Sequence, residues 1–507
     1  MSGVPVLTAA EATGWDGAAR KQFRIPSRVL METAGRAAAA VIVRECPDVR
    51  KGGALVVAGA GNNGGDGWVL ARALHGAGVQ VTVTGLDPKT DDAVDNRALA
   101  RLAGVAELTR EEPWPQSTVI VDALLGTGAA GPARGDVQAL AERIAGAGAA
   151  VVALDGPTGL DLSSGEAHGP VRARLTVTFG GVRRGHLLAR EWCGKVIVVD
   201  IGFPPADAQW PLLVTDAWAG SRLPPLTPTM HKGDRGRVTV VGGAAGMTGA
   251  ALHAARAALA AGAGLVKLVA AKETIEAART TLPDVLTVES KLGGELEPGA
   301  REALDWADAL VVGPGLGRDA ERARFLAAVL SQRPVPAVVD ADALHLYDRK
   351  ADRPLVFTPH VGEFRALAGD RLADLAANDR WAAAREAAGD LRATVLLKGV
   401  PTVIAAPRVP GLVVASGNPG LATGGSGDLL AGFIGAFLAR GREGPEAAAL
   451  GAHALGRGAE EGARRWTARS LRPADVLAAL PDVWRAWLND VPAGPPIVAI
   501  LDAVETE

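Results

Sequence analysis

Short apolar runs recur along this chain and alternate with longer, alanine-rich stretches. In the first half these runs occupy residues 54–61, 79–86, 117–126, 149–159 and 195–202. Each run reaches a Gly, Asp or Asn at its carboxyl end. Continuous apolar strands that alternate with helices are typical of a parallel sheet covered on both faces. We therefore predict an α/β protein that binds its ligands at the carboxyl ends of the strands.

The pattern is interrupted once and then starts again. Residues 204–228 are rich in proline, which suits a junction between domains. Apolar runs resume at residues 237–246, 264–271, 307–317, 336–344, 355–360 and 394–399. A chain of 507 residues is also too long for one ordinary domain. We predict two tandem α/β domains, residues 1–220 and 221–507.

Charge and cysteine content exclude several classes of protein. Lys and Arg number 53 against 56 Asp and Glu, so there is no electrostatic case for binding nucleic acid or an anionic membrane. Two cysteines cannot form a disulfide framework and fit a reducing cytosol. The amino terminus lacks the features of a signal peptide, and the apolar stretch 250–271 contains charged residues. We expect a cytoplasmic protein with no nucleic-acid or membrane partner.

A glycine-rich segment, GAGNNGGDG at residues 59–67, lies between a predicted strand and a predicted helix. It satisfies the G-x-G-x-x-G pattern, which lets backbone N–H groups approach a pyrophosphate. A tight turn without a ligand is the structural alternative, but it does not explain the polar side chains of Asn62, Asn63 and Asp66. Asp87 follows the next strand, where an acid can bind ribose, so an NAD-dependent oxidoreductase is one hypothesis.

Two aspartates lie at further strand ends of the first half. Asp122 precedes a second glycine loop at residues 126–132, and Asp155 is followed by Thr158. Each aspartate taken alone could be a helix cap. Together, Asn63, Asp122 and Thr158 offer hard oxygen ligands that suit an alkali or alkaline-earth cation. No His/Cys pattern fits zinc or another transition metal.

The most specific motif is NPGLATGGSGDLLAGFIGAFLARG at residues 418–441. Its glycine loop opens into an apolar helix, so backbone N–H groups and the helix dipole face any anion bound there. Asp428 lies at the start of that helix, and a capping role alone does not explain the glycine cluster. Loop, helix and acid resemble the ribokinase-like kinases. This resemblance implies that the loop stabilises a transferring phosphoryl group and that the aspartate accepts the proton of the attacking hydroxyl.

Five segments of the first half resemble the epimerase half of the NAD(P)H-hydrate repair enzymes. They are IPSRVLMETAGRAAA at 25–39, GAGNNGGDG, DALLGTG, DGPTGLD and TVTFG at 176–180. The resemblance implies a Rossmann-like, three-layer fold that interconverts the R and S epimers of NADHX and NADPHX. It implies that Asp155 is catalytic and touches the reacting ring, and that Arg183 stands where this family commonly has a lysine. Arginine keeps the charge but cannot shuttle a proton near neutral pH.

The same resemblance assigns binding residues. The implied substrate contacts are Asn62, Asn63, Gly64, Gly65, Asp66, Gly126, Thr127, Gly128, Ala129, Ala130, Gly131, Pro132 and Asp155. The implied ligands of a potassium ion are Asn63, Asp122 and Thr158.

Further segments of the second half resemble the ADP-dependent NAD(P)H-hydrate dehydratases, from about residue 231 to about residue 479. They are HKGDRGRVTVVGG at 231–243, GPGLG at 313–317, DADAL at 340–344, TPHVGEF at 358–364 and LKGVPTVIA at 397–405. The resemblance implies that Ala250, Gly317, His360 and Asp428 contact the hydrate, with Asp428 catalytic. It implies that Lys398, Gly399, Val400, Pro401, Thr402 and Gly427 contact the adenine nucleotide, and that a magnesium ion bridges nucleotide oxygens.

Some of these residues have structural alternatives. His360 alone could be a loop histidine, and Lys398 could be a strand-end lysine. Glu363 is a weaker candidate for orienting other groups.

The resemblances together predict a bifunctional enzyme. The first domain would exchange the epimers of NADHX and NADPHX, and the second would dehydrate the S form with ADP as co-substrate, giving AMP and phosphate. One alternative is a ribokinase-like kinase for a small alcohol such as a hydroxymethylpyrimidine, fused to a non-catalytic dinucleotide-binding module. Arg183 is the clue that favours such a silent module. The apolar helices of these domains are also compatible with a homo-oligomer.

Overall fold

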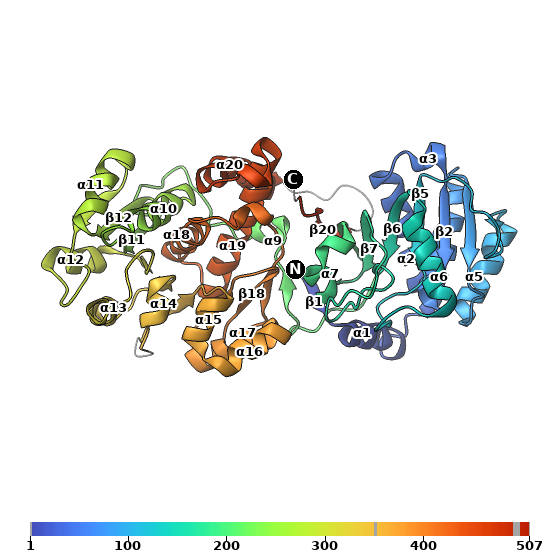
Figure 1. The fold of residues 1–507 in the computed structure, drawn as a ribbon, viewed down its shortest axis with the longest axis horizontal. Coiled ribbons are helices and arrows are strands. Elements are labelled where there is room, and N and C mark those ends of the chain that lie inside the picture. The colour runs from blue at the N-terminus through green and yellow to red at the C-terminus, as the bar shows by residue number, and fades with distance from the viewer. Residues whose placement is uncertain (1–2, 349–351, 490–496, 506–507) are drawn as a thin grey trace. The chain divides into compact units, whose positions relative to one another are not determined.

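The computed structural model describes residues 3–348, 352–489 and 497–505. The chain forms two compact units, one from the described parts of Met1–Leu213 and Val491–Val504 and the other from those of Val214–Asp490 and Glu505–Glu507 (Figure 1). The division thus falls between residues 213 and 214, whereas we expected it near residue 220. We also expected the whole carboxyl-terminal segment in the second domain, but residues 497–504 belong to the first unit.

The first unit alternates strands and helices along most of its length. Its elements are β1 Val4–Leu7, α1 Ala9–Lys21, α2 Ser27–Glu45, α3 Val49–Gly52, β2 Ala54–Ala58, α4 Asn62–Gly76, β3 Val81–Gly85, α5 Asp91–Leu102, β4 Ala106–Glu107, β5 Val119–Ala123, α6 Gly135–Gly146, β6 Ala150–Leu154, β7 Leu175–Phe179, β8 Val182–Arg183, α7 Arg184–Leu188, α8 Arg190–Cys193, β9 Lys195–Val199, β10 Leu212–Leu213 and β20 Ile497–Leu501.

The main sheet of this unit has the order β20-β9-β7-β6-β5-β2-β3-β4. All neighbours are parallel except β20, which is antiparallel to β9. The chain builds the sheet outward from β2 in one direction through β3 and β4, and then continues from β5 in the other direction. Strand order therefore reverses between β2 and β5, and ligands bind at such a reversal in open α/β sheets.

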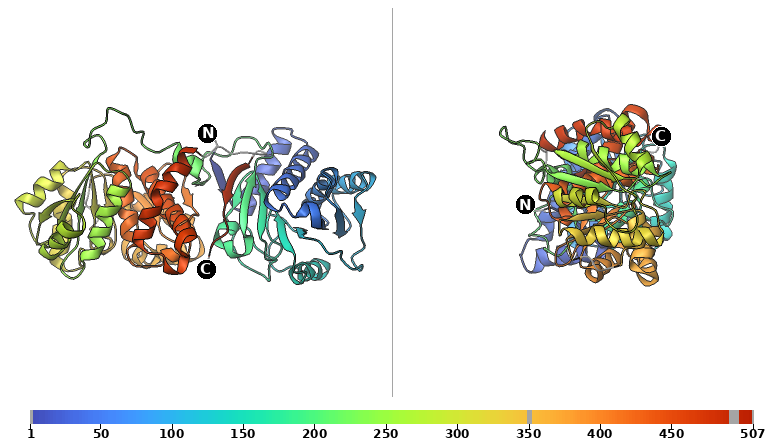
Figure 2. Two further views of the ribbon diagram at one scale, coloured as in Figure 1. Left: turned by 90° about the horizontal axis from the view of Figure 1, so that it is seen from above. Right: turned by 90° about the vertical axis from the view of Figure 1, so that its left-hand side faces the viewer.

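Helices cover both faces of this sheet. Val56 and Ala58 of β2 pack with α2 and α4 in one apolar core, whereas Leu55 and Val57 pack with α6 in another. Successive side chains of a strand point to opposite faces, so a strand buried on both sides reads as a continuous apolar run. Helices flank the sheet on both faces, as Figures 1 and 2 show. This three-layer arrangement confirms the predicted fold of this unit.

The last described strand of the chain returns to the first unit. β20 pairs with β9, with Ile500 opposite Ile197 and Leu501 opposite Val196, and it is the dark red strand beside the green strands in Figure 2. The side chain of Arg190 also donates a hydrogen bond to the carbonyl of Asp502. This pairing covers what would otherwise be an open edge at β9, and it explains why the carboxyl-terminal segment belongs with the first unit.

The second unit is longer and richer in helix. Its elements are α9 Asp216–Gly220, β11 Arg237–Val241, α10 Thr248–Ala260, β12 Leu265–Ala270, α11 Lys272–Thr281, β13 Leu286–Glu289, α12 Pro298–Trp306, β14 Ala309–Val312, α13 Ala320–Gln332, β15 Ala337–Val339, α14 Asp342–Leu346, β16 Leu355–Phe357, α15 Val361–Ala368, α16 Asp370–Asn378, α17 Arg380–Leu391, β17 Thr394–Leu397, β18 Thr402–Ala405, β19 Leu412–Val414, α18 Ser426–Ala439, α19 Gly444–Trp466 and α20 Pro473–Asn489.

Strand order in this unit runs β13-β12-β11-β14-β15-β16-β17-β18-β19. Strands β13 to β17 are parallel, and the last two pairings are antiparallel. Order reverses between β11 and β14. The apolar helix α18 packs on β11, β14 and β15 and between α10 and α19. Gly432 and Gly435 permit this close packing, since a Cβ would collide with the Ala254 carbonyl at the first and with Val311 at the second.

No helix in the described ranges is both long enough and apolar enough to cross a membrane.

A polar network anchors the first helix of the second unit. The carboxylate of Asp216 in α9 accepts hydrogen bonds from His453 Nε2 at 2.7 Å and Trp487 Nε1 at 2.9 Å, and it pairs with Arg457 at 3.1 Å. Burial acts to raise the pKa of Asp216, but these donors outweigh it and the pKa is lowered. Helix α9 is thus tied to α19 and α20 by a carboxylate that is stable in its charged form.

We expect Asp216→Asn to lower the free energy of unfolding by about 1–3 kcal/mol at neutral pH, because buried donors lose a charged acceptor. A carboxyl group whose pKa is lowered in the folded protein stabilises the fold at a pH above its ordinary pKa of about 4. This stabilisation is lost as the pH falls through the lowered pKa. The difference between variant and wild type should therefore shrink in acid. Urea unfolding over this pH range measures it. Asp374→Asn, at an exposed ion pair, should stay within about 0.5 kcal/mol; equal behaviour of the two variants would contradict the assignment.

Candidate active sites

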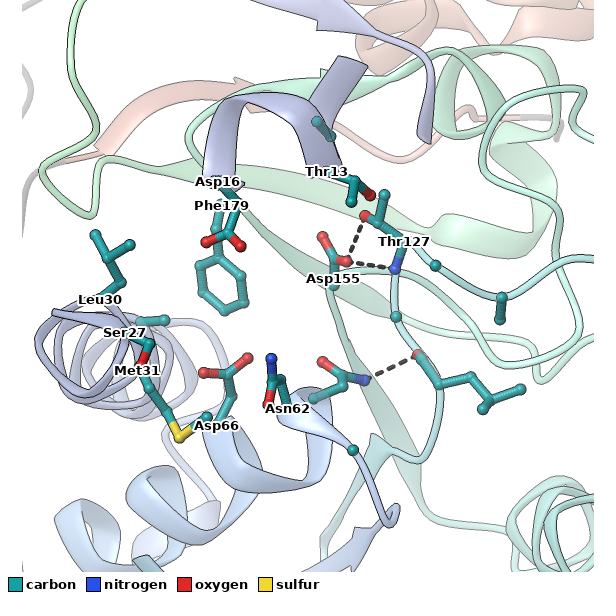
Figure 3. A pocket seen from close by; sticks show the side chains of 18 of the residues that line it. Thr13, Asp16, Ser27, Leu30, Met31, Asn62, Asp66, Thr127, Asp155 and Phe179 are labelled. Carbon is teal, nitrogen blue, oxygen red and sulfur yellow. Dashed lines mark hydrogen bonds between the residues drawn. The ribbon is translucent and has the colours of Figure 1, made fainter. Parts of the chain in front are cut away.

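A cavity of about 570 Å³ lies in the first unit where strand order reverses. The ends of β2, β5 and β6 form its floor, and the amino-terminal helices α1 and α2 form one wall (Figure 3). Its lining includes polar and charged groups from separate parts of the chain, namely Thr13, Asp16, Arg20, Ser27, Asn62, Asn63, Asp66, Thr127, Asp155 and Arg183. The apolar lining includes Leu30, Met31, Phe179 and Phe203.

Asp155 is the most firmly held carboxylate of the cavity. It follows β6 directly, with a positive φ of 63°. Oδ2 accepts hydrogen bonds from the backbone N and the hydroxyl of Thr127 at 2.6 and 2.5 Å. Oδ1 accepts from Thr178 at 3.2 Å and from Arg183 at 3.1 Å. Burial acts to raise the pKa of Asp155, but Arg183 and Thr127 outweigh it and lower the pKa, so this group is ionised at neutral pH.

Arg183 is the counter-charge of Asp155, and its guanidinium is bound on every side. Besides Asp155 it donates to the Thr127 hydroxyl at 2.9 Å and to the carbonyls of Phe179 and Gly181. Its backbone N donates to Nδ1 of the buried His186 at 3.1 Å. Burial, together with Arg183, lowers the pKa of His186 to about 4. Arg183 therefore supplies a fixed charge, and the neutral imidazole of His186 supports the turn that presents it.

Asp66 differs from Asp155 in its surroundings. Its carboxyl group points into the same cavity from α4, with Asp16 of α1 nearby (Figure 3). Burial, with the charges of Asp155 and Asp16, raises the pKa of Asp66 well above its ordinary value. The cavity thus contains one carboxyl group whose pKa is lowered and one whose pKa is raised. Two such groups around one cavity are suited to acid–base chemistry.

The predicted cation ligands lie close together behind the cavity. The carboxylate of Asp122 accepts the hydroxyl of Thr158 at 2.8 Å and its backbone N–H at 2.8 Å. The amide of Asn63 donates to the carbonyls of Leu125 and Leu154 at 2.8 and 3.2 Å. The Oδ1 atom of Asn63 is buried and has no hydrogen-bond partner within the described part of the chain. A buried oxygen without a donor, in a group of oxygen atoms, suits a hard cation.

The remaining predicted residues of the first unit divide by position. Asn62, Gly126, Thr127, Gly128 and Ala129 line the cavity, and Ala130 lines an adjoining one, whereas neither cavity includes Gly131 or Pro132. Gly64 and Gly65 lie under the wall; a Cβ at the first would collide with the Gly59 carbonyl and one at the second with Met31. Asp87, the proposed ribose-binding acid of an oxidoreductase, is instead exposed and paired with Arg97.

The residues that sequence reasoning missed come mainly from the amino-terminal helices. Thr13, Asp16, Ser27 and Met31 reach the cavity from α1 and α2, which precede the glycine motif in the chain. A lone carboxylate or an alanine-rich helix carries no spacing signal of its own, so these contacts depend on tertiary packing.

In the second unit the predicted aspartate lies at a helix start, as the motif indicates. Asp428 is in the first turn of α18, behind the left-handed Gly425. Burial and the neighbouring carboxylates of Asp340, Asp342 and Glu363 raise the pKa of Asp428 to about 7, although Lys398 acts to lower it. A group with a pKa near the working pH is suited to accept a proton from a bound hydroxyl.

Lys398 lies beside this helix start, between two carboxylates. Its Nζ atom is 3.1 Å from Asp340 Oδ1 and 3.4 Å from Glu363 Oε2. The carboxylate of Asp340 is almost fully buried and also accepts the Thr358 hydroxyl at 2.7 Å. A Cβ at Gly427 would lie 3.6 Å from Lys398 Nζ. The DADAL segment thus contributes Asp340 to the site, a residue whose role was not predicted.

The other predicted residues of this unit surround the same region. Gly317, with φ of 89°, donates its backbone N–H to Asp342 at 2.9 Å, and Ala250 is close to Gly315 of the same loop. His360 caps α15, since Nδ1 accepts from the backbone N of Gly362 and Glu363, and its ring is more than half exposed. Thr402 begins β18, and Val400 is exposed at the turn before it.

Comparisons with known proteins agree with this division into two units. The family model described as YjeF-related protein N-terminus matches residues 27–185, and the one described as NAD(P)H-hydrate dehydratase matches residues 238–482. A crystal structure of a ribokinase-like superfamily protein from Enterococcus faecalis is 25% identical, with a TM-score of 0.50, and covers 55% of this chain and 96% of that one. The predicted ribokinase-like fold of the second unit is confirmed.

Relatives of similar length extend across both units. The bifunctional NAD(P)H-hydrate repair enzyme of Moorella thermoacetica is 37% identical and covers 95% of this chain and 96% of its own. The enzyme of the same description from Escherichia coli is 36% identical and covers 89% of this chain and 88% of its own. The chain therefore belongs to the family of bifunctional NAD(P)H-hydrate repair enzymes.

Proposed function

We propose that this chain repairs hydrated nicotinamide dinucleotides in two steps. The first unit exchanges the R and S epimers of NADHX and NADPHX, and the second unit dehydrates the S epimer with ADP as co-substrate. The observation that carries the proposal is the position of Asp428, a carboxyl group with a pKa near 7 at the start of the helix that follows the glycine loop. The proposed substrates are the small molecules NADHX, NADPHX and ADP.

Epimerisation requires proton transfer around the carbon that carries the hydroxyl. The hydroxyl leaves as water after it gains a proton, and water that returns on the other face loses one. Asp66, whose pKa is raised, is the proton donor, and the ionised Asp155 is the acceptor. Arg183 keeps Asp155 charged. Arginine in place of the family's lysine is compatible with this mechanism, because neither proton passes through it.

Potassium is the cation that we propose for the oxygen group behind the cavity. The partnerless Oδ1 of Asn63, the carboxylate of Asp122 and the hydroxyl of Thr158 would hold it. This donor set is purely oxygen, as alkali cations prefer, and lacks the nitrogen and sulfur ligands of transition metals. The ion would supply a positive charge beneath the loop that begins at Gly126 and would thus favour an anionic substrate.

Dehydration becomes easy once the hydroxyl is a phosphate ester. The terminal phosphoryl group of ADP is transferred to the ring hydroxyl, whose proton passes to Asp428, and AMP is released. Phosphate then leaves while the neighbouring ring carbon loses a proton to solvent, so that the ring regains its double bond and the reduced dinucleotide forms. The N–H groups of the glycine loop stabilise the charge of the transferring group.

Magnesium would reach this site on the phosphate groups of the nucleotide. Among the residues that the structure describes, no three His, Cys, Asp or Glu side chains form a group that could hold a metal ion. Nucleotide sites commonly bind magnesium through phosphate oxygens and one or two carboxylates, which Asp428 and its neighbours can supply.

An R/S mixture of NADHX, incubated with ADP and magnesium, tests both steps. We expect complete recovery of dihydronicotinamide absorbance, faster than spontaneous exchange allows. Asp155→Asn should stop recovery at the S fraction, and Asp428→Asn should reduce the rate of all recovery by about 10²–10⁴-fold. Recovery that stops at the S fraction in the wild type would refute epimerisation, and no recovery with ADP or ATP would refute the whole proposal.

The pH dependence of dehydration tests the role of Asp428. Because its carboxylate must accept the hydroxyl proton, kcat/KM should fall as the pH drops below about 7, where Asp428 becomes protonated. Asp342 contributes to the raised pKa, so Asp342→Asn should move this acid limb to lower pH. Asp305→Asn, at an exposed position, should leave it in place. An acid limb that does not respond to Asp342→Asn would show that another group titrates.

Thermal unfolding in potassium chloride and in choline chloride tests the cation site. A ligand that binds only the folded state stabilises it by about 2.7 kcal/mol at a hundredfold excess over its Kd. We therefore expect potassium to raise the unfolding temperature of the wild type. Asn63→Leu should abolish this increment, and the neighbouring Asn62→Leu should retain it. If potassium still raises the unfolding temperature of Asn63→Leu, the proposed cation site is excluded.

A further inference from the structure

Arg380, the first residue of α17, lies against the segment predicted to bind the nucleotide. A Cβ at Gly399 would lie 2.9 Å from Cζ and 3.0 Å from one terminal nitrogen of Arg380, and closer still to the other. The guanidinium therefore occupies the space where residue 399 would carry a side chain. Gly399 also has a φ of 153°, a backbone conformation that favours glycine.

The guanidinium of Arg380 has no counter-charge in the part of the chain that the structure describes. Its guanidinium makes no hydrogen bond or ion pair with any residue that the structure describes. The adjacent Asp379 instead caps α17 through the backbone N–H groups of Trp381 and Ala382, both at 3.0 Å. The Arg380 side chain is partly buried, and this burial lowers its pKa. A partly buried cation without a partner is costly unless an anion joins it.

Lys398, the predicted cation of this segment, has its charge already neutralised. Asp340 and Glu363 both lie within 3.4 Å of its Nζ atom. Asp342 is likewise paired with Arg318, so this second cation is also already matched by a carboxylate. An anionic nucleotide would be repelled by these carboxylates unless a further cation faces it. Arg380 is the cation in contact with the predicted segment that remains available.

We infer that Arg380 binds the phosphate groups of the nucleotide co-substrate. The inference rests on the proposed use of ADP by the second unit and adds a binding residue to it. Arg380 contacts Gly399, Gly399 follows Lys398, and Lys398 lies beside Gly427 at the start of α18. These groups form a continuous row along which a diphosphate can lie. The planar guanidinium can donate two parallel hydrogen bonds to phosphate oxygens, which an ammonium group cannot do.

Nucleotide binding by the full-length protein tests the inference. Arg380→Gln should weaken ADP binding by about 10–100-fold, as expected for loss of a charge-assisted hydrogen-bonded pair. Adenosine lacks phosphate, so its inhibition constant against dehydration should stay unchanged. Arg380→Lys keeps the positive charge but cannot donate two parallel hydrogen bonds, so its affinity for ADP should be intermediate. Arg385→Gln removes an exposed arginine from the same helix and should bind ADP as the wild type does.

The outcomes separate the inference from the function on which it rests. A wild-type protein that binds neither ADP nor ATP would overturn the proposed function itself. If the wild type binds ADP and Arg380→Gln binds it equally well, Arg380 is not a phosphate ligand. An equal loss of ADP and adenosine affinity would show that Arg380 only shapes the segment, and this would also overturn the inference. Unfolding temperatures of both glutamine variants verify that the fold is intact.

Discussion

The reversal of strand order at the centre of each sheet creates the space in which both sites lie. In the first unit, α4 leaves β2 toward one side of the sheet, and the chain after β5 turns toward the other. The carboxyl ends of these two strands, at Ala58 and Ala123, therefore face an opening that no crossover connection covers. In the second unit the corresponding reversal lies between β11 and β14. Glycine loops follow these strands, and only loops without side chains allow backbone N–H groups to approach a ligand at such a point.

Within these spaces the surroundings of each carboxylate decide its chemistry. Asp155 and Asp428 are both aspartates, and both are partly removed from water. Burial by itself acts to raise the pKa of each carboxyl group. At Asp155 a guanidinium and the two donors of Thr127 reverse that effect. At Asp428 three further carboxylates add to it. One unit thus keeps a permanent carboxylate, whereas the other keeps a carboxyl group that can gain and lose a proton near neutral pH.

Much of this architecture could be predicted from the sequence because its determinants are local. Apolar runs indicated the strands, and glycine clusters marked the turns after them. The aspartates Asp122 and Asp155 at strand ends, and Asp428 at a helix start, marked the candidate sites. The carboxyl-terminal strand β20 could not be assigned in this way, since its pairing with β9 joins residues some 300 positions apart. Asp16 was missed because packing between elements distant in the chain brings it to the cavity, and Arg380 because the approach of α17 to the loop after β17 carries no sequence motif.

The proposed phosphate contact of Arg380 explains why the positive charge of the second site is divided between two residues. Lys398 bound to Asp340 and Glu363 is rigid and neutralised, so it can fix the geometry beside Gly427 without holding the product strongly. The guanidinium beside Gly399, which is unpaired among the residues that the structure describes, supplies the proposed affinity for the nucleotide. Were both cations free, AMP and phosphate would be retained after the reaction; were both neutralised, the surrounding carboxylates would repel ADP. One paired and one unpaired cation satisfy both requirements, as turnover of an anionic co-substrate demands.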